Sequence, residues 1–185
     1  MADNPLGISD SDLIEVGKPN TIGGVLQDFG NKLQDDLRKS LQQKITTVTP
    51  KTLEQSIVFD LKFLGSSYSF KLKMEDYWEF VDKGVQGVGG VMKNGRAWGI
   101  KNATSPFRFT DKKPPIAELS GWANNNRVNP FVVQNSVFHR GIKATNFYSD
   151  VVDQQLIDDL VKDLEKAGAR EVEISLKNSF DGIGN

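Results

Sequence analysis

Residues 56–74, SIVFDLKFLGSSYSFKLKM, place the strongest constraint on the fold of this chain. Apolar and polar residues alternate on both sides of a short Gly-Ser-Ser sequence. Alternate side chains of a strand point to opposite faces, and a short glycine-containing turn joins antiparallel strands. The stretch therefore predicts a β-hairpin with one buried apolar face. That face would comprise Ile57, Phe59, Leu61, Phe63, Tyr68, Phe70, Leu72 and Met74.

The residues before the hairpin can cover its apolar face. From Thr21 to about Thr46, apolar side chains recur at steps of three and four, with charged side chains between them. This spacing is typical of a long amphipathic helix. The helix should stop before Pro50, because the β-branched residues and the proline there disfavour its continuation. Its apolar face would comprise Ile22, Leu26, Phe29, Leu33, Leu37 and Leu41.

The chain after the hairpin predicts four more helices and one strand. A short aromatic helix should end at Gly84, a second should open at Pro114-Pro115, and a third should run from Asn129-Pro130 to Gly141. We expect the last helix to begin at Ser149 or Asp150 and to end at Gly168. The alternating sequence REVEISL, residues 170–176, predicts a third strand. In the third helix, Val133, Val137 and Phe138 should face inward.

These elements predict an α+β fold, in which a small antiparallel β-sheet, the hairpin plus the C-terminal strand, packs against the long N-terminal helix and further helices. A chain of 185 residues is long enough to bury a core as one domain. We expect an N-terminal arm over residues 1–20 and a single domain over residues 21–176. A glycine-rich loop at 84–110 and a C-terminal tail at 177–185 complete the organisation.

Charge and cysteine content disfavour several functions. The 23 lysine and arginine residues nearly balance the 24 aspartate and glutamate residues, so no global field attracts nucleic acid or a membrane. The chain has no cysteine and one histidine, so neither a disulfide nor an ordinary zinc site is expected, and we expect no cofactor. No apolar run approaches the roughly 20 residues that span a bilayer, and the N-terminus lacks signal-peptide features. We therefore expect a protein made and kept in a cytoplasm, with no membrane partner.

The single histidine, His139, raises the question of catalysis. It falls in the last turn of the third predicted helix, where the helix dipole favours a cation, and Arg140 follows it. No G-x-S-x-G elbow or comparable motif accompanies it, so we expect no catalytic residue and assign both side chains a structural or contact role. The enzymatic alternative, a peptidase or nuclease that uses His139 with acidic residues, predicts loss of turnover in His139→Ala.

Two segments carry apolar side chains outside the predicted core. The N-terminal arm contains Leu13 and Ile14, and the glycine-rich loop has no phosphate-binding motif. The loop is either a flexible surface loop or an arm that orders on assembly, because long loops are usually functional or disordered. Its candidate contact residues are Val88, Val91, Met92 and Trp98, with Ile100 beside them.

Two further segments, DYWEFVDKG at 76–84 and RGIKATNFYSDVV at 140–152, support a resemblance. With the order of the predicted elements, they resemble the neck and tail-completion proteins of tailed bacteriophages, an HK97-type family of small head–tail joining proteins. Lys83, Ala144 and Asn146 depart from the family pattern, in which prolines are common at the last two positions. The residues that match are Tyr77, Val81, Gly84, Gly141, Ile142, Thr145 and Phe147. We expect Phe138, Ile142 and Phe147 to anchor this joint, with His139 and Arg140 at its rim.

The resemblance, which covers residues 21–176, implies a non-enzymatic virion subunit that is assembled in the host cytoplasm. Such subunits form closed rings with copies of themselves around the DNA channel, between portal or adaptor proteins and the tail. The station within the neck or tail stays open. A ring needs two different complementary surfaces on each subunit, which the arm and the loop could supply. A monomeric adaptor for a cellular partner is the other non-enzymatic alternative.

Overall fold

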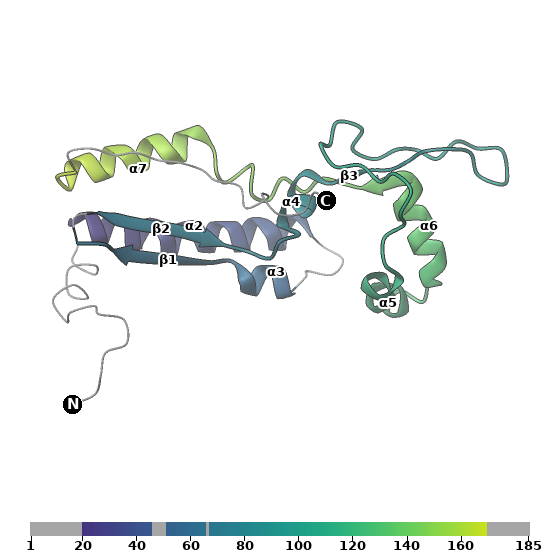
Figure 1. Ribbon diagram of the computed structural model, residues 1–185, viewed down its shortest axis with the longest axis horizontal. Helices are drawn as coiled ribbons and strands as arrows, with labels where there is room; N and C mark the ends of the chain where they lie inside the picture. Colours follow the sequence, from purple (N-terminus) through teal and green to yellow (C-terminus); the bar gives the residue numbers. More distant parts are fainter. Residues whose placement is uncertain (1–19, 46–50, 66, 170–185) are drawn as a thin grey trace, which may run out of the picture. The chain divides into compact units, whose positions relative to one another are not determined.

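The computed structural model describes residues 20–45, 51–65 and 67–169, and its mixture of helices and antiparallel strands confirms the α+β class (Figure 1). The described residues form two compact units. Unit 1 comprises residues 20–40, 51–76 and 150–169, and unit 2 comprises residues 41–45 and 77–149. The single domain expected over residues 21–176 stays a prediction. The third strand at 170–176, the tail at 177–185 and all of the arm except Asn20 lie outside the described residues.

Unit 1 contains the predicted hairpin. Strands β1 (Val58–Phe63) and β2 (Tyr68–Lys73) are antiparallel, and their register pairs Phe59 with Leu72 and Leu61 with Phe70. These side chains share one half-buried face, as the alternation predicted.

Helix α2 (Ile22–Lys44) lies on that face, as expected. The Phe29 ring meets the Phe70 ring edge to face, with 5.6 Å between their centroids. Gly30 allows close packing, because a Cβ there would lie under 3.0 Å from the Phe59 ring. Short helix α3 (Lys51–Ser56) precedes β1, and Arg38 of α2 donates to the Glu54 and Ile57 carbonyls at 3.2 and 2.9 Å. The buried apolar residues of unit 1 are Leu26, Leu33, Leu37, Leu53, Ile57 and Leu164.

The last helix, α7 (Gln154–Lys166), begins later than the sequence predicted. Ser149 and Asp150 looked like N-terminal caps, but Asp153 is the cap and accepts a hydrogen bond from the Leu156 N–H at 2.8 Å. The prediction was wrong because the Ser149 hydroxyl, which would cap a helix here, donates to the Asp82 side chain, as does the Ser149 N–H. The helix ends before Gly168, whose φ of +93° suits the end of a helix, as predicted.

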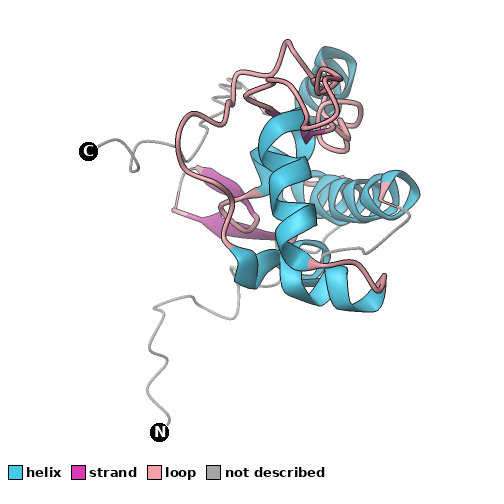
Figure 2. Cartoon of the chain, turned by 90° about the vertical axis from the view of Figure 1, so that its right-hand side faces the viewer, coloured by secondary structure: helices cyan, strands magenta, loops and turns pink. Residues whose placement is uncertain are grey.

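Unit 2 contains three helices at predicted positions, and Figure 2 shows how much of the chain around them is loop. They are α4 (Trp78–Lys83), α5 (Ile116–Asn125) and α6 (Pro130–Arg140), and α5 packs against α6. Asn129 caps α6 by accepting from the Phe131 N–H. The expected inward face of α6 is only half-buried at Val133, Val137 and Phe138. No residue of this helix is fully buried.

A second sheet in unit 2 was not predicted. Strand β3 (Val85–Gln86) pairs antiparallel with β4 (Gly141–Ile142), so Gln86 lies opposite Gly141. Gly141 has a φ of +87°, and a Cβ there would lie under 3.0 Å from the Val85 carbonyl oxygen. The two strands approach closely because position 141 is a glycine.

Gly141→Ala is therefore expected to lower the free energy of unfolding by about 2–4 kcal/mol, since it adds a left-handed backbone penalty to a backbone clash. Gly121→Ala is the matched control, because this glycine lies in α5 with no atom within 4 Å of an added Cβ. It should raise stability by about 0.5–1 kcal/mol through helix propensity. Urea unfolding followed by circular dichroism measures both. Equal effects of the two variants would contradict the close approach.

Candidate interaction site

The glycine-rich loop, residues 84–110, is hydrogen-bonded to the end of α6. The N–H groups of Val88 and Gly89 donate to the carbonyls of Phe138 and His139 at 3.0 and 2.9 Å. On the returning side, the Lys101 N–H donates to the Arg140 carbonyl at 2.6 Å. Both sides of the loop are thus fixed to the same helical turn within one chain.

The tip of the loop folds back on itself. The Arg96 carbonyl accepts from the Met92 N–H at 2.7 Å, and the Met92 carbonyl accepts from the Gly95 N–H at 2.9 Å. Val91 forms an antiparallel bridge with Ala97, and Gly95 has a φ of +79°. The positive φ is the conformation that favours glycine, so one of the loop's glycines is explained by a turn.

An aromatic and cationic stack lies beside the loop. The Trp98 and His139 rings are nearly parallel, at an interplanar angle of 7° with 5.1 Å between centroids. The Arg140 guanidinium carbon lies 5.3 Å from the Trp98 ring centroid, which is within cation–π range. Three of the residues expected at an interface therefore come together in space.

His139 is held by packing contacts. Its Nδ1 lies 2.6 Å from the Gly89 carbonyl oxygen, so this nitrogen carries the proton, because a carbonyl only accepts. Its ring also meets Phe138 edge to face, with 5.2 Å between centroids. His139 thus contacts a carbonyl and two aromatic rings, which supports the structural or contact role expected from the sequence.

The remaining expected contact residues divide by exposure. Val91 is 69% exposed and Ile100 is 44% exposed, whereas Val88 and Met92 are half-buried. Leu13 and Ile14 lie outside the described residues. The loop thus displays two large apolar side chains to solvent, a feature that marks interaction surfaces when such side chains gather.

The two segments that carried the resemblance form one packed joint in unit 2. A Cβ at Gly84 would lie under 3.0 Å from the Ala144 nitrogen, so α4 ends directly against the second segment. The Val81 carbonyl accepts from the Thr145 hydroxyl at 2.7 Å, and Phe147 is fully buried. The expectation for Ile142 was wrong: it is 39% exposed, because its backbone pairs with β3 while its side chain lies at the surface. Tyr77, at the N-cap of α4, is also exposed.

Asp82 of α4 holds the joint together, although no sequence pattern marks this residue. This fully buried carboxylate accepts from the N–H groups of Tyr148 and Ser149 at 2.8 and 3.1 Å and from the Ser149 hydroxyl. Buried charges persist in proteins when such hydrogen bonds satisfy them. An acidic residue on a short helix is ordinarily solvated, so only the fold identifies Asp82 as a buried acceptor.

A second buried acid, Glu79, lies one helical turn before Lys83 and pairs with its ammonium at 3.6 Å. Its Oε1 is buried and has no hydrogen-bond partner among the described residues. Burial raises the pKa of the nearby Tyr148 hydroxyl above its usual value, and the carboxylates of Asp82 and Glu79 raise it further. The Tyr148 ring also contacts the Trp78 ring, with 4.6 Å between centroids.

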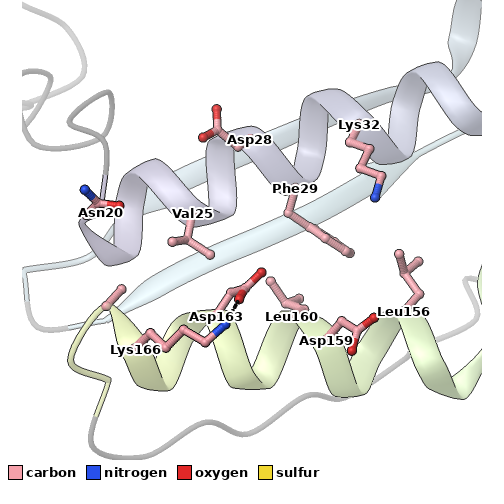
Figure 3. A pocket seen from close by; sticks show the side chains of 11 residues that line it. Asn20, Val25, Asp28, Phe29, Lys32, Leu156, Asp159, Leu160, Asp163 and Lys166 are labelled. Carbon is pink, nitrogen blue, oxygen red and sulfur yellow. Dashed lines mark hydrogen bonds and ion pairs between the residues drawn. The ribbon is translucent and has the colours of Figure 1, made fainter.

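Unit 1 contains a separate groove between α2 and α7, with a volume of about 410 Å³ (Figure 3). Its apolar lining includes Phe29, Leu156 and Leu160. The rim carries both charges: the hydrogen bond from Gln155 holds the pKa of Asp159 below its usual value, and the hydrogen bond to Asp163 raises the pKa of Lys166. Asp159 and Asp163 pair with Lys162 and Lys166 within α7, and the opposite side of the groove adds one acid and one base, Asp28 and Lys32 of α2. The lining therefore combines apolar side chains with charges of both signs.

The two units carry opposite formal charges. The sequence ranges 41–50 and 77–149 hold eleven lysine and arginine residues against four aspartate and glutamate residues, a charge of +7. The whole chain carries −1, so the remaining ranges carry −8. The near-neutral total concealed this separation. The loop has the same bias, since residues 84–110 contain no acidic residue and four exposed basic ones, Lys93, Arg96, Lys101 and Arg108.

Among the described residues, no cluster of three or more potential metal-ligating side chains could hold a metal ion. Within the same part of the chain, no helix is long and apolar enough to cross a membrane. Comparisons with protein-family models, curated proteins and solved structures found no significant match. The resemblance to head–tail joining proteins stays a prediction.

Proposed function

We propose that this chain is a structural subunit of a tailed-bacteriophage virion that assembles with copies of itself into a closed ring at the head–tail interface. In that setting it joins portal or adaptor proteins to the tail and acts without a cofactor. The station within the neck or tail is not part of the proposal.

One observation carries the proposal. The segments at 76–84 and 140–152, which carry the resemblance to head–tail joining proteins, pack on each other as one joint. Gly84, Gly141 and the buried Asp82 each serve that contact. Because the resemblance rests on both segments, their direct contact in one joint supports the proposal.

The surface of unit 2 also suits assembly. The loop presents exposed Val91 and Ile100 and also contributes Trp98 to the stack with Arg140, and a ring subunit requires an exposed apolar surface for its neighbour. His139 supports the hydrolase alternative less well, because it contacts a carbonyl and two aromatic rings. A general base would instead need a nucleophile and an orienting carboxylate.

Light scattering of the purified chain over a range of concentrations tests self-assembly, and negative-stain electron microscopy tests closure. We expect a discrete multiple of the subunit mass and annular particles with an axial opening. An antibody against the chain should label the head–tail junction of phage particles encoded by the same genome. A mass that stays monomeric at every concentration, together with unlabelled particles, would refute the proposal.

A further inference from the structure

The basic loop, residues 84–110, presents a surface whose chemistry restricts its partner. Lys93, Arg96, Lys101 and Arg108 are exposed, and none of them forms an ion pair with a described residue. The exposed apolar side chains of the loop lie in the same segment. A fitting partner therefore carries carboxylates or phosphates together with apolar groups.

The N-terminal segment of this chain, residues 1–19, has that composition. It holds four acidic residues and one basic residue, a formal charge of −3. In the sequence DSDLIEV, residues 10–16, Asp10, Asp12 and Glu15 surround the apolar Leu13 and Ile14. Charge and apolar content are thus complementary to those of the loop.

Length also permits contact with another subunit. An extended chain advances about 3.3–3.6 Å per residue, so a 19-residue segment can reach up to about 60 Å from Asn20. A ring requires a donor surface and a different acceptor surface on each subunit. A segment at one end of the chain and a loop in its middle meet that requirement.

We propose that the basic loop of one copy binds the acidic N-terminal segment of the next copy, an inference that rests on the proposed ring assembly. Asp10, Asp12 and Glu15 pair with Lys93, Arg96 and Lys101, while Leu13 and Ile14 cover Val91 and Ile100. Nucleic acid is also an anionic partner, but its phosphate backbone offers nothing to cover exposed Val91 and Ile100, so the protein segment fits better.

Charge reversal in the full-length chain tests the pairing. The loop-reversed variant is K93E/R96E/K101E, the arm-reversed variant is D10K/D12K/E15K, and the double-reversed variant combines both sets. K112E/R127E/K143E is the control, because it makes the same charge change at exposed positions of unit 2 outside the loop. Sedimentation velocity at low and raised salt measures association, since salt screens exposed charges.

Each singly reversed variant should associate about tenfold more weakly or worse than the natural chain, because three ion pairs become repulsive contacts. A mixture of the two singly reversed variants should associate, because each one's segment complements the other's loop. The double-reversed variant should associate as well. A loop reversal that weakens association no more than the control would overturn the pairing while leaving ring assembly intact.

Two other results would overturn the proposal in distinct ways. If the double-reversed variant associates but the mixture does not, the segment binds the loop of its own chain. If a labelled duplex oligonucleotide binds the natural chain, and only the loop reversal removes both this binding and self-association, the loop is a nucleic-acid surface.

A natural chain that remains monomeric would refute the proposed function first. Anisotropy of a labelled peptide of residues 1–19, titrated with the full-length arm-reversed chain, then tests the surface alone. Saturable binding to this chain, lost when the loop is also reversed, would show that the loop binds the segment even though no ring forms. An absence of binding would overturn it.

Discussion

Phe147→Ala is expected to lower the free energy of unfolding by about 3–5 kcal/mol, because it removes a fully buried aromatic side chain and leaves a cavity. Phe147 is the largest fully buried side chain of unit 2, where it lies in the joint between α4 and the segment that follows β4. Urea unfolding followed by tryptophan fluorescence measures the change in the transition that unfolds this unit.

Phe131→Ala is the matched control for this prediction. Phe131 lies on α6 in the same unit and is 65% exposed, so its truncation should change stability by no more than about 0.5 kcal/mol. If the two alanine variants unfold at the same urea concentration as the natural chain, Phe147 does not anchor the joint.

Asp82→Ala is expected to cost about 3 kcal/mol or more. The substitution removes three hydrogen bonds and leaves the N–H groups of Tyr148 and Ser149 without their acceptor. Buried donors that lose a charged acceptor cost more than the net value of the bonds themselves. Chemical unfolding of the full-length chain again gives the difference.

Two further variants, Asp82→Asn and Asp158→Ala, separate the loss of the hydrogen-bond acceptor from the general effect of truncating an aspartate. Asparagine keeps an oxygen where Oδ1 accepts both N–H groups, so it should lose only part of the stability that alanine loses. Asp158 is an exposed carboxylate of α7, and its truncation should change stability by no more than about 0.5 kcal/mol. An Asp82→Ala variant that behaves like Asp158→Ala would show that the carboxylate does not hold the joint.

Local patterns predicted the regular elements well. The alternation around Phe59 and Leu72 identified the hairpin, and the spacing from Ile22 to Leu41 identified its helical cover, because each pattern extends over several residues. Strands β3 and β4 were missed because two residues cannot display a period. The start of α7 was misplaced because the Ser149 hydroxyl bonds to Asp82, far away in the sequence, and Asp153 caps the helix instead.

The candidate site was predicted only in its parts. Trp98, His139 and Arg140 were each assigned to an interface, but their stack depends on a loop that returns to the end of α6. The charge separation could not be read from the total charge of −1, because the charge of each unit can be counted only once the boundaries of the units are known. The role of Asp82 could be recognised only in the folded structure, because its partners lie more than sixty residues away in the sequence.

Unit 1 is built from chain stretches that are synthesised at different times. Its helix α2 and its hairpin precede unit 2, whereas α7 follows residue 149. At 5–20 residues per second, residues 77–149 take roughly 4–15 s to translate. During that interval Val25 and Phe29 lack the α7 side chains that line the same groove. A nascent chain that stalls within unit 2 would therefore leave an apolar strip open to chaperones and to aggregation.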